Sequence, residues 1–372
     1  MTRWTDGDFQ ASAGIGMPSS SQFGCGVASP LISHDARLPY LRRYGRGSLA
    51  YSSLQKGVDY FLMSNVGYIP FALVGDHDFA PICLSDPICH QESMLTLLDR
   101  FFQLYDYPVF LHISRETAAL LAERNFLVNE IGTETLIDVQ HFSLSGKERA
   151  FLRSQINRAE KDGVTVKEQR CSQAGAEVLK AISASWLTKK VVHTHELSFI
   201  VRPAVYSDEP DVRKFVAYRR DSAIGFGAFD PIYRDGRVIG YLANTLRTTG
   251  DFSYSVSDYI VMEALRTFKE EGKDILSLGY SPLYKVNDSG EFNYSKLLKG
   301  IFKCAYEFGE CLYEFKALAF HKSRYHPGHN GCREMTVYCA CPPPVRLGLI
   351  GKVFELVGVD AKVQVAEQLI IH

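Results

Sequence analysis

Apolar residues that recur at strand or helix spacing begin near His34. Three short apolar stretches separated by glycine and asparagine predict a strand meander, over residues 48–54, 60–64 and 68–74. Residues 91–105 instead carry apolar side chains at helical spacing, with one wide apolar face. The pattern continues as a strand, a helix, a strand and a charged helix, over residues 108–113, 115–124, 135–139 and 146–162.

A pattern of the same kind repeats in the second half of the chain. It predicts a helix, three strands, a second helix and a last strand, over residues 176–187, 212–218, 223–233, 237–247, 258–271 and 274–278. The sequence therefore predicts an α+β protein of two successive units, residues 36–170 and 171–345. Residues 1–35 are predicted to be a flexible leader. Residues 346–372 are predicted to be an amphipathic tail that packs back onto the second unit or, alternatively, lies on a membrane surface.

Composition excludes several classes of protein. The chain of 372 residues carries 41 Lys and Arg against 42 Asp and Glu, which excludes binding of nucleic acid through bulk charge but allows a local basic patch. No apolar run approaches the length of a membrane-spanning helix. The nine cysteines match no disulfide framework, and pairs such as Cys339 and Cys341 lack the spacing of structural zinc ligands. We therefore expect free thiols, no metal and a cytoplasmic protein.

One glycine-rich segment has the composition of a pyrophosphate-binding loop. Arg42–Gly47 (RRYGRG) fits the loop of acetyl-CoA-dependent N-acetyltransferases, in which a strand precedes the glycines and a helix follows them. Here residues 48–51 look like a strand, and the second Gly-x-Gly, at 225–227, lies inside another predicted strand. The sequence thus disfavours an acetyl-CoA enzyme, and we expect no cofactor.

Residues 145–170 hold seven basic side chains against four acidic ones, which by itself describes a solvated helix face. Within this stretch, Leu152–Gly163 (LRSQINRAEKDG) resembles a segment of the C-terminal catalytic domain of aminoacyl-phosphatidylglycerol synthases. These enzymes are the lysyl- and alanyl-transferases also called multiple peptide resistance factors. Five further segments resemble that family, in its order: Arg43–Ala50 (RYGRGSLA), Leu84–Pro87 (LSDP), Asn129–Glu134 (NEIGTE), Leu276–Leu283 (LSLGYSPL) and Phe315–Pro327 (FKALAFHKSRYHP). The resemblance covers about residues 38–345.

The resemblance implies two tandem GNAT-like acyltransferase domains, each a mixed, mostly antiparallel sheet with flanking helices. It also implies transfer of an aminoacyl group from an aminoacyl-tRNA to a lipid hydroxyl. Exchange of one ester for another is close to thermoneutral, so the reaction needs positioning, a proton route and stabilisation of the carbonyl oxyanion rather than ATP. With tRNA as the donor, the charged helix is expected to contact its phosphates, which makes Arg153 and Arg158 candidate substrate-binding residues.

The resemblance also selects four candidate catalytic residues. Asp258 lies where the family has an acidic residue at a helix start, although Ser257 or Asp258 could simply be the N-cap of that helix. Arg247 matches an arginine that would face a phosphate or a carboxylate. Lys322 and Arg324 match two basic positions, the second of which is lysine in the family.

Four further residues are candidate substrate contacts: Asn244, Glu196, Tyr280 and Ser281. Asn244 stands where the family has aspartate, and an amide cannot pair with a cationic aminoacyl group. This weakens lysine as the transferred amino acid and leaves alanine, glycine, serine and aspartate open. Glu196 belongs to an E-x-x-F element that ends at Phe199, and the other two residues fall within LSLGYSPL.

The sequence therefore predicts an aminoacyl-tRNA-dependent aminoacyltransferase that acts on the hydroxyl of a lipid, either of the phosphatidylglycerol type or another lipid such as a sterol. A soluble small molecule is the alternative acceptor, and a non-catalytic module that binds tRNA or lipid is a hypothesis of another class. The predicted partners are an aminoacyl-tRNA and a hydroxyl-bearing acceptor. The predicted location is the cytoplasm, with peripheral contact at the inner face of the membrane.

Overall fold

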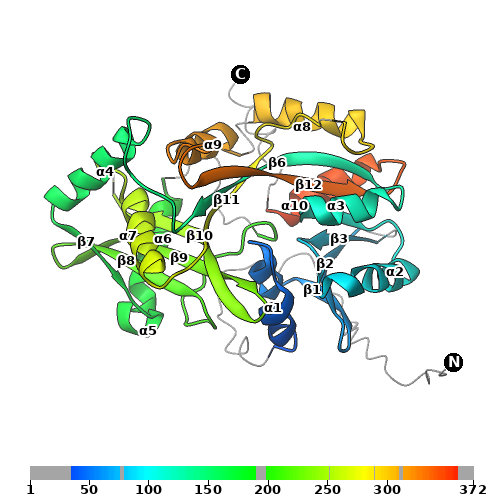
Figure 1. Cartoon of the computed structure of the whole chain (residues 1–372), viewed down its shortest axis with the longest axis horizontal. Coiled ribbons are helices and arrows are strands. Elements are labelled where there is room, and N and C mark those ends of the chain that lie inside the picture. The colour runs from blue at the N-terminus through cyan, green and yellow to red at the C-terminus, as the bar shows by residue number, and fades with distance from the viewer. Residues whose placement is uncertain are drawn as a thin grey trace.

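The computed structural model describes residues 35–75, 79–189, 198–250, 252–288, 290–309 and 313–358. Within these ranges the strands form one mixed sheet (Figure 1). The strands are Asp59–Met63 (β1), Gly67–Val74 (β2), Ala80–Leu84 (β3), Ile88–Cys89 (β4), Val109–Ile113 (β5), Leu127–Asp138 (β6), Val164–Glu168 (β7), Arg213–Arg219 (β8), Ser222–Arg234 (β9), Arg237–Thr248 (β10), Ile275–Pro282 (β11) and Cys332–Cys341 (β12). The α-helices are Leu38–Tyr44 (α1), Met94–Leu104 (α2), Arg115–Ala122 (α3), Ala150–Lys161 (α4), Cys171–Ala174 (α5), Ala176–Leu187 (α6), Val256–Glu270 (α7), Lys296–Phe308 (α8), Phe315–Ser323 (α9) and Leu347–Leu356 (α10). Two short 3-10 helices span Ala50–Leu54 (η2) and Gln91–Ser93 (η3).

The sheet contains the same strand–helix–strand unit twice. The strand order is β1-β2-β3-β5-β12-β6-β11-β10-β9-β8-β7, and β4 pairs with β2. Among the described strands, β3 runs parallel to β5 and β10 runs parallel to β11, whereas the other neighbours are antiparallel. A helix lies between the two strands of each parallel pair along the chain, α2 in the first pair and α7 in the second. This arrangement confirms the predicted α+β class with a mixed, mostly antiparallel sheet.

Strands from the two halves of the chain are interleaved in the sheet. β12, from the C-terminal part, lies between β5 and β6 of the first half, and β6 in turn pairs with β11 of the second half. Strand pairing therefore crosses the predicted boundary at residues 170 and 171, and it crosses again where β7 pairs with β8. The assignment of 36–170 and 171–345 to separate units stays a prediction. Residues 1–34 of the predicted leader lie outside the described residues.

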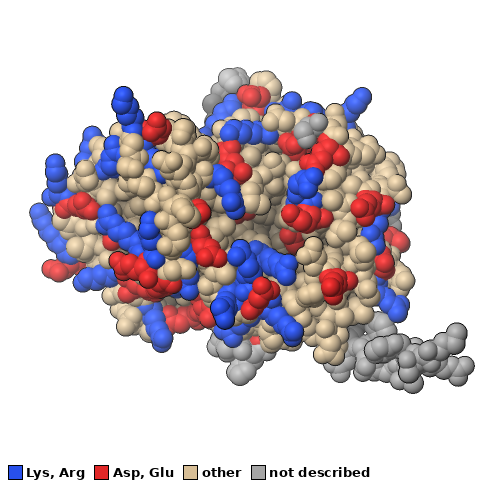
Figure 2. All heavy atoms as spheres, viewed as in Figure 1, with Lys and Arg blue, Asp and Glu red and all other residues tan. Residues whose placement is uncertain are grey.

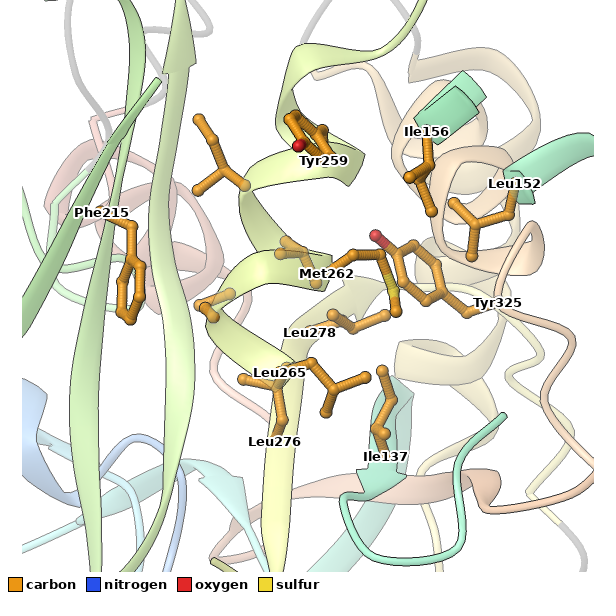
Figure 3. Packing of buried hydrophobic residues seen from close by; sticks show 14 of the residues in the cluster. Ile137, Leu152, Ile156, Phe215, Tyr259, Met262, Leu265, Leu276, Leu278 and Tyr325 are labelled. Atoms are coloured by element: carbon orange, nitrogen blue, oxygen red, sulfur yellow. The ribbon is translucent and has the colours of Figure 1, made fainter. Parts of the chain in front are cut away.

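Helices α6 and α7 cover opposite faces of strands β8 to β10. Phe215 and Phe229 pack against α7, whereas Val216 and Phe226 of the same strands pack against α6. Figure 3 shows the α7 side, where Tyr325 lies among apolar residues of α7, α4 and β11. The described part of the predicted tail forms α10, whose apolar residues pack against a neighbouring cluster that includes β2.

One predicted strand is wrong. Residues 48–54 contain the 3-10 helix η2, and all five of its residues are buried. The Ser53 hydroxyl donates to the Ala50 carbonyl and also hydrogen-bonds with the Tyr68 hydroxyl, so side chains stabilise a tight turn here. An apolar run this short does not distinguish a strand from such a turn. The preceding segment, 45–47, follows helix α1, so it still lacks the strand that precedes a pyrophosphate loop.

The contact between β6 and β11 generates a test of the fold. A Cβ atom at Gly132 would lie 2.2 Å from the Ser281 carbonyl oxygen, and the φ angle of Gly132 is +144°. We expect Gly132→Ala to lower the free energy of unfolding by about 2–4 kcal/mol, because two backbones would have to move apart. The matched control is Gly47→Ala, since no atom lies within 4 Å of the Cβ that it adds. Urea denaturation measures both variants, and equal midpoints would contradict the described packing.

Candidate functional site

Asp258 and Arg324 meet where the end of α9 lies over the start of α7, and Lys322 lies on the same helix end but contacts β11 instead. Asp258 is the third residue of α7, and its side chain is fully buried. The helix begins after Ser255, whose hydroxyl accepts a hydrogen bond from the Asp258 backbone N–H at 3.2 Å. Ser255 is therefore the N-cap, and the alternative in which Ser257 or Asp258 caps the helix is wrong. The Asp258 carboxylate contacts the end of α9 instead.

Three side chains at the end of α9 surround the Asp258 carboxylate. The Tyr325 hydroxyl donates to Oδ1 at 2.9 Å, and Nη1 of Arg324 donates to Oδ2 at 3.3 Å. Nε2 of His321 lies 3.5 Å from Oδ1. Burial lowers the pKa of His321, against the attraction of Asp258, and burial raises the pKa of Tyr325 well above its usual value. The carboxylate thus contacts one cation and two groups that are neutral near pH 7.

Lys322 contacts β11. Its Nζ donates to the Tyr280 carbonyl at 2.6 Å, and the side chain is almost fully buried. Burial lowers the pKa of Lys322 to about 7, although the attraction of the Glu134 carboxylate partly opposes this shift. Glu134 lies on β6 and accepts a hydrogen bond from the Ser277 hydroxyl. Near neutral pH the neutral amine of Lys322 is therefore populated, and it can accept a proton.

Arg247 is not part of this cluster. It pairs with Phe226 across β10 and β9, on the face that α6 covers, whereas Asp258 belongs to the helix on the other face. The Arg247 guanidinium lies over the Trp186 ring at 4.9 Å and donates to the Tyr206 hydroxyl at 3.2 Å. A β-bulge in β10 reverses the alternation of side chains shortly before this residue. The structure therefore does not bring Arg247 to Asp258.

The four candidate substrate contacts do not share one site. Asn244 donates to the Arg202 carbonyl at 3.0 Å. Tyr280 supplies the carbonyl that binds Lys322, while its hydroxyl donates to the backbone of β6. Ser281 is buried in the ladder between β6 and β11. Glu196 lies outside the described residues.

A buried charge network next to Asn244 was not predicted from the sequence. Arg202 binds Asp230 through Nε at 2.8 Å and binds Glu209 through Nη1 at 2.7 Å. Lys214 adds a second cation, 3.9 Å from Glu209. These residues are spread over 202–230, and their spacing matches no local motif. By contrast, the two further residues that contact Asp258, His321 and Tyr325, fall within the 315–327 segment that carries the resemblance.

The basic residues of α4 divide into two kinds. Arg149 is buried and donates to four backbone carbonyls, and Arg153 donates to two carbonyls of the preceding loop. These two guanidinium groups stabilise the start of the helix, so the candidate Arg153 is already engaged by the protein itself. Arg158 and Lys161 are exposed, and the first of them donates to the Ser253 carbonyl at 3.2 Å.

A separate groove of about 590 Å³ lies between α1 and the turn that joins β9 to β10. Arg42, Arg43 and His90 line it, and it shares no lining residue with the Asp258 cluster. Figure 2 shows Lys and Arg side chains gathered over this part of the molecule, beneath a central hollow. Within the described ranges no group of three His, Cys, Asp or Glu side chains could hold a metal ion. No described helix is both long and apolar enough to cross a membrane.

Residues 39–333 match the model of a protein family described as phosphatidylglycerol lysyltransferase, C-terminal. The chain belongs to this family. Among its relatives, the phosphatidylglycerol lysyltransferase of Bacillus subtilis (strain 168) is 27% identical over 259 residues, which are 67% of this chain and 29% of that protein. The phosphatidylglycerol lysyltransferase of Staphylococcus xylosus is 25% identical over 266 residues, which are 69% of this chain and 30% of that protein. The matched region thus spans about three tenths of the length of these relatives.

Two solved structures share this α+β fold with its mixed, mostly antiparallel sheet. The structure of L-PGS from Bacillus licheniformis has a TM-score of 0.68 at 21% identity and covers 86% of this chain and 96% of that one. The C-terminal domain of a putative lysylphosphatidylglycerol synthetase from Agrobacterium fabrum also has a TM-score of 0.68, at 19% identity. It covers 87% of this chain and 97% of that one.

The lowered pKa of Lys322 predicts a pH-dependent stability. From about pH 7 upward the unfolded lysine, with its usual pKa of 10.5, binds more protons than the folded one, so the free energy of unfolding rises with pH. We expect a gain of about 2 kcal/mol between about pH 7 and about pH 9, which Lys322→Met removes. The matched control is Lys56→Met, at an exposed lysine, which should retain the gain. Denaturant titrations at both pH values measure the effect. A Lys322→Met variant whose stability rises in parallel with that of the wild type would contradict the assignment.

Proposed function

We propose that this protein transfers an aminoacyl group from an aminoacyl-tRNA to the hydroxyl of a lipid of the phosphatidylglycerol type. The observation that carries the proposal is the buried Lys322 amine, with a pKa of about 7, on the same helix end as the Arg324–Asp258 pair. Family membership supports it, because the relatives are named for the transfer of lysine to phosphatidylglycerol. All three residues lie within the matched range.

Lys322 provides the proton route. The acceptor hydroxyl attacks the carbonyl carbon of the aminoacyl ester, and its proton passes to the neutral Lys322 amine. A new ester bond forms between that carbon and the lipid oxygen, while the bond to the terminal ribose oxygen of the tRNA breaks. The proton then moves from Lys322 to the ribose oxygen, which regenerates the amine. A pKa near 7 suits both steps, because the group gains and loses a proton readily at neutral pH.

Arg324 and Asp258 hold the acceptor in place. Nε of Arg324 is buried and has no hydrogen-bond partner among the described residues, whereas 24% of the side chain is exposed and can bind an anionic group such as a lipid phosphate. Asp258 contacts Arg324 and Tyr325 and thereby positions the guanidinium. Asn244 carries no charge, which makes alanine, glycine, serine and aspartate the amino acids to test before lysine.

Two substitutions test this mechanism. Asp258→Asn and Lys322→Ala should each lower transfer by at least about 100-fold with the fold intact, the scale of losing one acid–base or electrostatic group. The matched controls are Asp99→Asn and Lys56→Ala, which change exposed residues of the same kinds. Transfer is measured as radiolabel that passes from charged tRNA into an organic-extractable product.

The partition of the label also separates the alternatives. Label in a water-soluble product instead would indicate a soluble acceptor, and the absence of any product despite tRNA binding would indicate a binding module. Activity within about twofold of wild type in both site variants would remove these residues from the mechanism.

The proposed aminoacyl-tRNA donor leads to a prediction for the basic residues of α4. Arg158→Gln combined with Lys161→Gln should weaken tRNA binding and reduce the log–log salt slope by about 0.7–0.9 for each lost phosphate contact. Arg153→Gln should leave the slope unchanged, because its guanidinium is already bound to backbone carbonyls. Filter binding at several salt concentrations compares the wild type, the double variant and Arg153→Gln. Unchanged affinity and slope in the double variant would show that α4 is only a solvated face.

A further inference from the structure

Four exposed apolar side chains form a ridge that runs from α4 across α9 to α8, helices that lie along the upper edge of the molecule in Figure 1. They are Phe151 of α4, Phe320 of α9, and Leu297 and Phe308 of α8. Their exposed fractions are 53%, 66%, 49% and 80%. Exposure of this much apolar surface is unfavourable in water, so a surface that gathers such residues marks an interaction site.

Contacts between the three helices make the ridge continuous. The Arg324 guanidinium lies over the Phe151 ring at 5.3 Å and over the Phe320 ring at 5.5 Å. Lys316, one turn before Phe320 on α9, donates to the Glu307 carboxylate of α8 at 3.2 Å. The next residue of α8 is the exposed phenylalanine at its end. One end of the ridge therefore lies directly against the Asp258 site, because Arg324 also binds Asp258.

Helix α8 has the pattern of a helix that lies in the surface of a bilayer. Leu297 and Phe308 are eleven residues apart, about three helical turns, and so share one face. Leu298 is its one buried residue. Lys296 and Lys303 are exposed, lie about two turns apart, and have no ion pair among the described residues. An apolar face flanked by lysines is typical of helices that bind anionic membranes.

We propose that the ridge docks onto an anionic lipid bilayer, with α8 in the headgroup layer and its apolar face inserted. A bilayer fits this surface better than RNA does, because RNA binding depends on phosphate contacts and the ridge is built mainly from large apolar side chains. The lysines of α8 complement anionic headgroups. A lipid headgroup held against the ridge would lie next to Arg324. This last consequence rests on the proposed function, whereas membrane docking itself can be measured without it.

Vesicle flotation of the whole chain tests the docking. The wild type should bind vesicles of phosphatidylcholine mixed with phosphatidylglycerol more tightly than vesicles of phosphatidylcholine alone. Leu297→Ser combined with Phe308→Ser should weaken binding by at least about tenfold. Lys303→Gln should weaken binding about fivefold, and only for the anionic vesicles.

Matched controls remove similar side chains elsewhere. Phe79→Ser combined with Leu104→Ser removes two apolar side chains that are 55% and 61% exposed, and Lys56→Gln removes an exposed lysine. Both controls should bind vesicles as the wild type does. Wild-type vesicle binding by the α8 double variant would overturn the proposal. If vesicle binding is unchanged while the variant loses affinity for uncharged tRNA, the ridge binds RNA and the proposal is overturned. If vesicle binding is unchanged while the oligomeric state changes, the ridge binds a second copy of the chain and the proposal is also overturned.

A transfer assay distinguishes failure of the docking proposal from failure of the proposed function. The α8 double variant should transfer to water-soluble, short-chain phosphatidylglycerol at the wild-type rate and lose transfer to vesicle-embedded phosphatidylglycerol. Equal loss with both acceptors would overturn the docking proposal, because α8 would then act on the reaction itself. If the wild type transfers to neither acceptor, the proposed function fails, and flotation still decides whether the ridge binds membranes.

Discussion

The interleaving of strands from the two halves is the constraint on which the rest of the structure depends. β12 lies between β5 and β6, so the chain that leaves β11 must cross to the other half of the sheet, and it forms α8 and α9 on the way. This path brings the end of α9 over the start of α7, where Arg324 and Tyr325 meet Asp258. Without the first half, β12 would have no partner strands and α9 would lose its anchor.

The same interleaving of strands creates the environment of Lys322. Its amine binds the Tyr280 carbonyl of β11 and is attracted by Glu134 of β6, and these strands pair across the two halves. Burial of an amine is costly unless hydrogen bonds and opposite charges compensate it. Here the compensation is partial, and the pKa falls to about 7. The burial that costs stability thus gives the side chain a proton affinity suited to chemistry at neutral pH.

The sequence predicted the elements that have a clear period, such as the α7 helix and the strands before it. It failed at residues 48–54, where side-chain hydrogen bonds stabilise a turn within an apolar run. It also failed to show that Arg247 lies away from Asp258. Tyr241 and Ala243 face α7, and unbroken alternation would bring Arg247 to that face too. The bulge that follows Ala243 reverses this order, and spacing alone does not reveal a bulge.

The pH dependence of the transfer rate tests the role of Lys322 most directly. The rate is measured in a single turnover with saturating charged tRNA and lipid, and spontaneous hydrolysis of the tRNA ester is subtracted. The account predicts a rate that rises with pH through about 7 and then levels, because the neutral fraction of the amine saturates. A rate that is constant or falls between about pH 6 and about pH 8 would contradict proton transfer by Lys322.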